Sequence, residues 1–434
     1  MWPSSQTPSA PSASKISPIS SSSPVAHENP SDMSGAGLYV ASWDGQLRQV
    51  VRLIKAGADV NWALNEDRST PLMVACQNGH RSIVRVLLDA GANLGRTNID
   101  GTSSLLLATV AGHKDVVELL LVRGAAADQE NVDGARPLYM ACQTGRKDLA
   151  QLLTDKGAAV DKPNQHTGCT PLFIACQNGH KDVVQWILEK GCPKESRAKD
   201  GSSPLYSAAG RGHTDVVQLL LDSGAAADQA RGDGSTPLLI AIQNGHKDVA
   251  QLLLDRGAAV DRAANNGITP LFRSCERGNM EFVEMVLGRS TASLNAKDEF
   301  GYTPLMAAAE FGHKDVVQKL LDMGADVNAT NNEGFTALDA SSHFGHKDIS
   351  RMLLERGAKV PACAETSAAA NSATQPGPSS APSAAAGAPQ QPHGKACLWC
   401  GASGKRLKCC SGCGTVWLCG KNANCSLRPS HCAA

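Results

Sequence analysis

Residues 301–328, GYTPLMAAAEFGHKDVVQKLLDMGADVN, contain the pattern that decides the fold. Thr303 can cap a helix through its hydroxyl, and Pro304 suits the first helical position because its missing N–H would have no partner there. Gly312 tolerates the left-handed conformation that ends a helix, and Asp315 is well placed for the dipole of a second helix. A Gly-Ala pair then ends the second helix. The stretch predicts a helix, a turn, a second helix and a loop.

This unit recurs along the chain at intervals of 33 or 34 residues. The glycine that ends the first helix is the clearest marker, and it stands at Gly79, Gly112, Gly145, Gly179, Gly212, Gly245, Gly278, Gly312 and Gly345. Gly45 marks a degenerate earlier copy, and pairs such as Asp200-Gly201 supply tight turns before each cap. A fixed period of this length predicts stacked repeats with one continuous core.

The TPL, GH and GADVN motifs in register resemble the ankyrin repeat, and the resemblance covers residues 34–361 with about ten repeats. It implies an α fold, an ankyrin-repeat solenoid of helix-turn-helix-hairpin units. The family's usual histidine after TPL is replaced, so its hydrogen bond to the threonine is absent and apolar packing is expected in most copies. The replacements are Met73, Tyr139, Phe173, Tyr206, Leu239, Phe272, Met306 and Asp339. The copy near residues 287–289 lacks the Gly-Ala ending.

Histidines and cysteines at fixed repeat positions are predicted to be structural. Equivalent residues of stacked repeats lie about 10 Å apart, whereas a shared zinc needs each nitrogen at about 2.1 Å. This spacing excludes a common metal site for His80, His113, His180, His213, His246, His313 and His346. Free cysteine is a compact apolar filler, which we expect for Cys76, Cys142, Cys176 and Cys275.

No motif of a phosphate-binding loop, a nucleophile elbow or a zinc protease occurs, so the sequence predicts a protein that is not an enzyme and has no small-molecule substrate. A repeat stack offers instead a long concave face for binding a protein. Residues at the loop tips, which vary between otherwise similar copies, are the candidates for contact. They are Asn65, Glu66, Arg96, Asn98, Asn131, Gln165, His166, Lys199, Arg231, Asn265, Glu299 and Asn332.

Composition outlines the remaining segments. Residues 1–33 are Ser/Pro-rich with one lysine and no arginine, which favours a disordered tail over a transit peptide. Residues 362–394 are rich in Ala, Ser and Pro and predict a disordered linker. No run is apolar enough for a membrane span, and the scattered thiols suit a reducing compartment, so the expected location is cytoplasmic or nuclear.

The last segment, residues 395–434, contains eight of the fifteen cysteines. Cys397/Cys400 and Cys410/Cys413 form two Cys-x2-Cys pairs, each of which can bring two thiolates to one zinc ion. A segment of about 40 residues cannot bury an adequate core, so bound metal would have to supply its folding energy.

The order of these ligands resembles a MYND-type zinc finger, which implies two Zn²⁺ ions held in alternating fashion. The resemblance assigns Cys397, Cys400, Cys419 and Cys425 to the first ion, and Cys410, Cys413, His431 and Cys432 to the second. The first five positions match the family. Spacing departs after Cys419, and adjacent residues seldom ligate one ion, so the second site is in question and Cys409 is an alternative ligand.

The resemblances together imply a protein–protein interaction adaptor or scaffold, in which the ankyrin stack binds one protein and the zinc finger binds another, often through a proline-rich peptide. The alternative is a zinc-finger transcriptional or nucleic-acid-associated regulator that uses Lys405, Arg406 and Lys408. The mildly acidic middle of the chain, with a net charge of −4, makes nucleic acid an unlikely partner for the stack. A third hypothesis is a zinc-dependent ubiquitin-ligase module.

Overall fold

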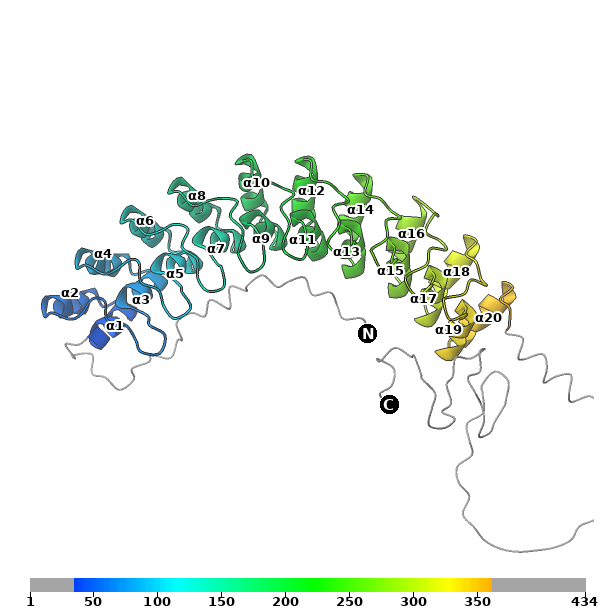
Figure 1. The fold of residues 1–434 in the computed structure, drawn as a ribbon, viewed down its shortest axis with the longest axis horizontal. Helices are drawn as coiled ribbons and strands as arrows, with labels where there is room; N and C mark the ends of the chain where they lie inside the picture. Colours follow the sequence, from blue (N-terminus) through cyan, green and yellow to red (C-terminus); the bar gives the residue numbers. More distant parts are fainter. Residues whose placement is uncertain (1–34, 361–434) are drawn as a thin grey trace, which may run out of the picture. The chain divides into compact units, whose positions relative to one another are not determined.

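The structure is a computed structural model that describes residues 35–360, and these residues form helices joined by short turns and hairpin-like loops (Figure 1). They divide into two compact units, residues 35–258 and residues 259–360. In each unit the chain alternates between two rows of helices, and each odd-numbered helix packs on the even-numbered helix that follows it.

The first unit holds seven helix pairs. Within each row, every helix contacts the next helix of the same row. The helices are α1 (Gly35–Trp43), α2 (Leu47–Lys55), α3 (Pro71–Gln77), α4 (Arg81–Asp89), α5 (Ser104–Ala111), α6 (Lys114–Val122), α7 (Pro137–Gln143), α8 (Lys147–Asp155), α9 (Pro171–Gln177), α10 (Lys181–Glu189), α11 (Pro204–Arg211), α12 (Thr214–Asp222), α13 (Pro237–Asn244) and α14 (Lys247–Asp255).

The second unit holds three helix pairs with the same internal arrangement. Its helices are α15 (Pro270–Arg277), α16 (Met280–Leu287), α17 (Pro304–Glu310), α18 (Lys314–Asp322), α19 (Ala337–His343) and α20 (Lys347–Glu355). The prediction of an all-helical repeat solenoid is confirmed for the described residues.

The predicted caps start the odd-numbered helices. The Thr303 hydroxyl accepts a hydrogen bond from the Met306 backbone N–H at 3.3 Å, which satisfies one amide of the first turn. The same bond occurs at Thr70, Ser103, Thr170, Ser203, Thr236 and Thr269. Arg136 stands at the cap position of α7 and makes no side-chain cap.

Apolar packing replaces the family histidine after TPL, as predicted. Met73 and Phe272 mark the range of exposure at this position, from 0% to 6%, and the other five apolar side chains fall between them. Asp339 differs, because its carboxylate accepts from the Thr336 backbone N–H at 2.8 Å and completes a capping box. The odd-numbered helices are therefore fixed at their first turn either by apolar burial or, in the last repeat, by this local polar pair.

The copy near residues 287–289 departs from the others in geometry as well as in sequence. Gly288 directly follows α16 with φ −67°, and no left-handed residue follows it before Gly301, whereas Gly324, the second residue after α18, has φ +87°. The loop after α16 therefore leaves its helix along a different path.

Candidate functional site

A row of hairpin-like loops precedes the odd-numbered helices and carries the predicted contact residues. Each loop is closed by a backbone bond such as Asn98 N–H to the Thr102 oxygen, at 3.1 Å. Neighbouring tips are joined by a second bond, for example Val132 N–H to the Asp100 oxygen at 2.9 Å. The second unit has the same bonds. There the Glu299 N–H donates to the Asn266 carbonyl oxygen, and the Asn332 N–H donates to the Phe300 carbonyl oxygen. Each loop is therefore bonded to its neighbours, and the loops form ordered rows.

The structure separates the predicted tip residues into exposed and structural ones. Glu66, Gln165, His166, Lys199, Asn265, Glu299 and Asn332 are among those with exposed side chains. Asn131 is only 6% exposed, and its side-chain oxygen accepts from the backbone N–H groups of Asp133 and Ala135. Arg231 is half-buried and pairs with Asp200 at 3.0 Å. The Asn131 side chain therefore holds its own loop together, and Arg231 joins its loop to the loop before α11, so the fold already uses both side chains.

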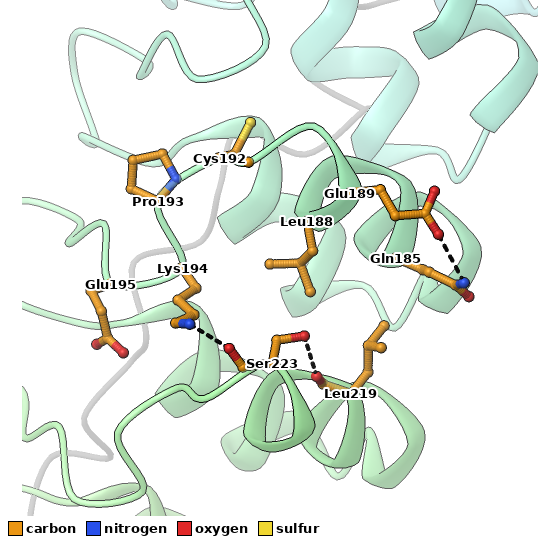
Figure 2. Close-up of a pocket in the computed structure, with 10 residues that line it drawn as sticks. Gln185, Leu188, Glu189, Cys192, Pro193, Lys194, Glu195, Leu219 and Ser223 are labelled. Carbon is orange, nitrogen blue, oxygen red and sulfur yellow. Dashed lines mark hydrogen bonds between the residues drawn. The ribbon is translucent and has the colours of Figure 1, made fainter.

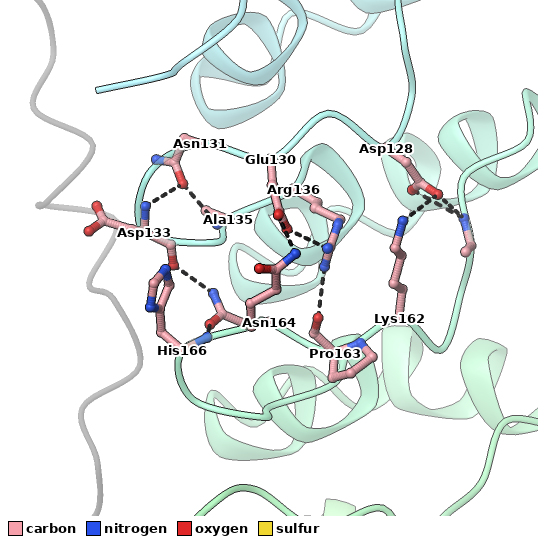
Figure 3. A network of polar contacts seen from close by, with 12 residues as sticks. Asp128, Glu130, Asn131, Asp133, Ala135, Arg136, Lys162, Pro163, Asn164 and His166 are labelled. Carbon is pink, nitrogen blue, oxygen red and sulfur yellow. Dashed lines mark hydrogen bonds and ion pairs between the residues drawn. The ribbon is translucent and has the colours of Figure 1, made fainter. Parts of the chain in front are cut away.

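A buried ionic network fixes the loop before α7 (Figure 3). Arg136 is 5% exposed, and its guanidinium donates to the Pro163 carbonyl oxygen at 2.7 Å and pairs with Glu130. Glu130 also accepts from the exposed Gln165 amide of the next loop. This network ties the loop before α7 to the loop before α9, next to the cap position where α7 has no threonine.

The carboxyl ends of the odd-numbered helices present a second set of variable residues that the sequence interpretation missed. The residue after α17 is Phe311, which is 52% exposed, and the residue after α19 is Phe344, which is 41% exposed. The equivalent residues of the first unit are Asp44, Asn78, Ala111, Thr144, Asn178, Arg211 and Asn244. Variation directly before the recurring glycine was the signal that could have identified them.

The recurring histidines are structural, as predicted. Each Nε2 lies between 2.9 and 3.1 Å from a backbone carbonyl oxygen of the preceding repeat. A carbonyl only accepts, so Nε2 must carry the proton in each case. This row of side chains joins repeats to one another and leaves no nitrogen pair for a shared metal ion.

The cysteines of the odd-numbered helices belong to the core, also as predicted. Cys76, Cys142, Cys176 and Cys275 are each 0% exposed, and burial raises the pKa of their thiols. Buried neutral thiols are poor nucleophiles. These residues therefore pack the core and offer no reactive site.

The family assignment follows from comparison with known proteins. A family model described as ankyrin repeats (3 copies) matches residues 38–131, 117–198, 191–264 and 271–362. The chain belongs to the ankyrin-repeat family. The ankyrin repeat domain of human ASB11 is a similar solved structure, with 30% identity, a TM-score of 0.47, and coverage of 51% of this chain and 98% of that one. Among curated proteins, none matches the chain.

Ankyrin repeats bind proteins and are typically non-enzymatic, and nothing among residues 35–360 points to catalysis. A cavity of about 610 Å³ lies between α10 and α12 and is lined by Leu188, Leu219 and the loop around Cys192 (Figure 2). Burial raises the pKa of the Cys192 thiol to about 11, which keeps it protonated near neutral pH. Lys194, at the rim of the cavity, donates to the Ser223 carbonyl oxygen. The cavity thus presents no activated group.

The predicted zinc ligands Cys397, Cys400, Cys410, Cys413, Cys419, Cys425, His431 and Cys432 lie outside the described residues. Within residues 35–360, no group of three or more His, Cys, Asp or Glu side chains is placed to hold a metal ion. None of the helices in the described ankyrin repeats combines the length and the apolar character needed to cross a bilayer.

Proposed function

We propose that the chain is a non-enzymatic adaptor that binds one partner protein through its ankyrin repeats and a second through residues 395–434. The observation that carries the first half is the pair of variable rows, the loop tips and the ends of the odd-numbered helices, on an otherwise repetitive scaffold. Side chains that the fold does not require are available for recognition. The reducing compartments suggested by the scattered thiols, cytoplasm or nucleus, suit such a role.

The loop tips carry apolar side chains that the fold leaves in solvent. Ile99 and Val132, on consecutive tips, are each 59% exposed. Exposed apolar side chains on ordered backbone lose little conformational entropy on binding, which favours a protein contact there. Val122, at the end of the even-numbered helix α6, is 65% exposed and supplies a matched position away from the loops.

The test identifies a partner by affinity capture with the full chain and then measures binding of the purified partner. We expect Ile99→Ala with Val132→Ala to weaken binding about tenfold, because two buried interface contacts are lost. Val122→Ala should bind as the unaltered chain does. Equal effects of the tip and helix variants would place the partner elsewhere on the chain.

The second half of the proposal rests on the zinc-finger resemblance of residues 395–434. Here Cys397, Cys400, Cys419 and Cys425 would hold one Zn²⁺, and Cys410, Cys413, His431 and Cys432 another. Native mass spectrometry of the full chain, with and without chelator, should show two zinc ions per chain. One ion would support the first site alone, and none would remove the finger from the proposal.

The basic side chains of residues 395–434 favour one alternative, a nucleic-acid-associated regulator. Lys405, Arg406 and Lys408 lie in a segment with a net charge of +6 before any zinc or thiolate is counted. Contacts to phosphate weaken steeply as salt rises. A fluorescent DNA or RNA duplex titrated at two salt concentrations separates the cases, since the adaptor predicts no salt-dependent binding of this kind.

A further inference from the structure

The last two repeats concentrate aromatic side chains on the face formed by their loops and odd-numbered helices. Four of the chain's seven phenylalanines occur here, and among the described residues Phe300, Phe311 and Phe344 are the only phenylalanines with more than a third of their surface exposed. Tyr302 and Phe335, which precede the caps of α17 and α19, are partly exposed. We call these five residues the aromatic patch.

The backbone places the patch residues of one repeat beside the equivalent residues of the next repeat. Asn332 N–H donates to the Phe300 carbonyl oxygen at 3.0 Å, so the loop before α17 lies beside the loop before α19. The helices themselves are in contact and lie next to each other in Figure 1. Phe311 and Phe344 occupy the same position at the ends of these neighbouring helices.

Side-chain hydrogen bonds hold the loops that carry the patch. The Asp298 carboxylate accepts from the backbone N–H groups of Phe300 at 2.9 Å and Tyr302 at 2.8 Å. Asn331 does the same for Glu333 and Phe335, at 2.9 Å each. The rings are therefore presented on ordered backbone, which lowers the entropy lost on binding.

The imidazoles of His313 and His343 contact Phe311 and Phe344, and the full charges around the patch are mainly negative. Glu299 and Glu333 are exposed at the two loop tips, and Glu310 is half-exposed next to Phe311. Lys297 is the basic residue of these loops. Its ammonium donates to the Thr330 carbonyl oxygen, at 2.7 Å, in the loop before α19. Rings flanked by carboxylates attract a cation both through the ring quadrupole and through the negative charge of the carboxylates. Arginine suits such a site because its planar guanidinium stacks on aromatic faces.

We infer that the aromatic patch binds a segment of a partner protein in which arginine stands beside apolar residues. This inference rests on the proposed protein-binding function and names the chemistry of the partner. The equivalent helix-end positions of the first unit hold no aromatic residue. Recognition of arginine is therefore assigned to the last two repeats.

The test selects 12-residue peptides from a displayed random library with the full chain and measures the affinities of the selected peptides by fluorescence anisotropy. The expected peptides are enriched in arginine next to apolar residues. Replacing that arginine with neutral citrulline should weaken binding at least tenfold, and so should Phe311→Ala with Phe344→Ala. Val122→Ala, which removes an exposed apolar side chain from the end of α6 in the first unit, should leave the affinity unchanged.

Two results overturn the inference and leave the proposed protein-binding function in place. The first is that the selected peptides lack arginine, and the second is that they bind the Phe311/Phe344 variant with the same affinity as the unaltered chain. Peptide binding that emerges only after Lys405→Glu, Arg406→Glu and Lys408→Glu would show that the chain's own basic segment fills the patch, and also overturns it. If neither the phenylalanine nor the Ile99/Val132 variant affects any selected peptide, the proposed function fails together with the inference. Circular dichroism of each variant confirms that its helices are retained.

Discussion

The imidazole Nε2 of His213 lies 3.0 Å from the carbonyl oxygen of Gln177, at the end of the odd-numbered helix of the preceding repeat. The same ring fills the space beside Gly179, where an added Cβ would lie 2.6 Å from its Nδ1. One side chain thus satisfies a helix-end carbonyl and packs on a glycine without a side chain. The Gly-His pair therefore acts between repeats: the glycine of one repeat makes room for the histidine of the next.

Gly312 and Gly345 provide a matched test of this packing of a histidine on the glycine of the preceding repeat. Both have left-handed φ values, +77° and +78°, so alanine at either should cost about 1–2 kcal/mol through backbone strain. Of these two positions, only at Gly312 would the new Cβ meet a ring: His346 Cε1 would lie 2.6 Å from it, whereas no atom of residues 35–360 would lie within 4 Å of a Cβ at Gly345. We expect Gly312→Ala to cost about 1–3 kcal/mol more, as overpacked sites do.

Urea unfolding and hydrogen exchange of the α17–α20 amides measure this difference in the full chain. His346→Ala removes the ring, so adding it to Gly312→Ala should recover part of the lost stability, and the double-mutant cycle should show coupling between the two sites. Equal losses for the two glycine variants would mean that the histidine moves aside without cost.

The pH dependence of stability should carry the signature of His213. Burial is the largest cause that lowers the pKa of this imidazole from 6.5, while its bond to Gln177 opposes the shift. The unfolded chain then takes up a proton before the folded chain does, so stability is complete above about pH 6.5 and falls as the pH drops toward the lower folded pKa. His213→Gln, which keeps a donor for the carbonyl, should flatten that part of the profile.

Titration of the His213 Cε1 proton by NMR gives the folded pKa directly, and urea midpoints at pH 7 and pH 5 give the stability change. An unaltered pH profile in the His213→Gln variant would assign the acid sensitivity to other groups.

The sequence predicted the helices and their caps because each depends on local chemistry, as at Thr303 and Pro304. It also predicted that the histidines are structural, but not where their Nε2 atoms bond, because the acceptor belongs to another repeat. The bonds of Asn131 and Arg231 could not be predicted, since a polar loop residue gives the same sequence signal whether it bonds its own loop, bonds a neighbouring loop or faces solvent. Arg136 shows a similar limit: its partners, Glu130 and Pro163, lie on two different loops.

Asp339 should reduce stability at neutral pH. Its Oδ2 accepts from Thr336, but its Oδ1 is buried without a hydrogen-bond partner among residues 35–360, and burial raises its pKa. A raised folded pKa means that stability falls as the pH rises from the unfolded value through the folded one. Asp339→Asn keeps an oxygen for Thr336 and removes the buried charge, so we expect a more stable last repeat at pH 7.

Thermal unfolding of the full chain at pH 7 and pH 4 measures this advantage, which should shrink at the lower pH because the native aspartate is then increasingly protonated. Asp339→Ala is the control, since it loses the capping box and should be less stable than Asp339→Asn at both pH values. A variant Asp339→Asn that is less stable than the unaltered chain at pH 7 would show that the charge strengthens the cap by more than its burial costs.

Thiol labelling should separate Cys192 from Cys176. Cys192 is half-buried in the loop after α10 and its thiol has a pKa of about 11, whereas Cys176 is fully buried and its pKa is raised by desolvation alone. An alkylating reagent must reach a thiolate, so Cys192 should react slowly in the folded chain and Cys176 only after the repeats open. Peptide mapping by mass spectrometry, before and after urea, follows each site. Labelling of Cys176 at the rate of Cys192 in native buffer would contradict the tightly packed core, because an odd-numbered helix would then have to open as readily as a surface loop.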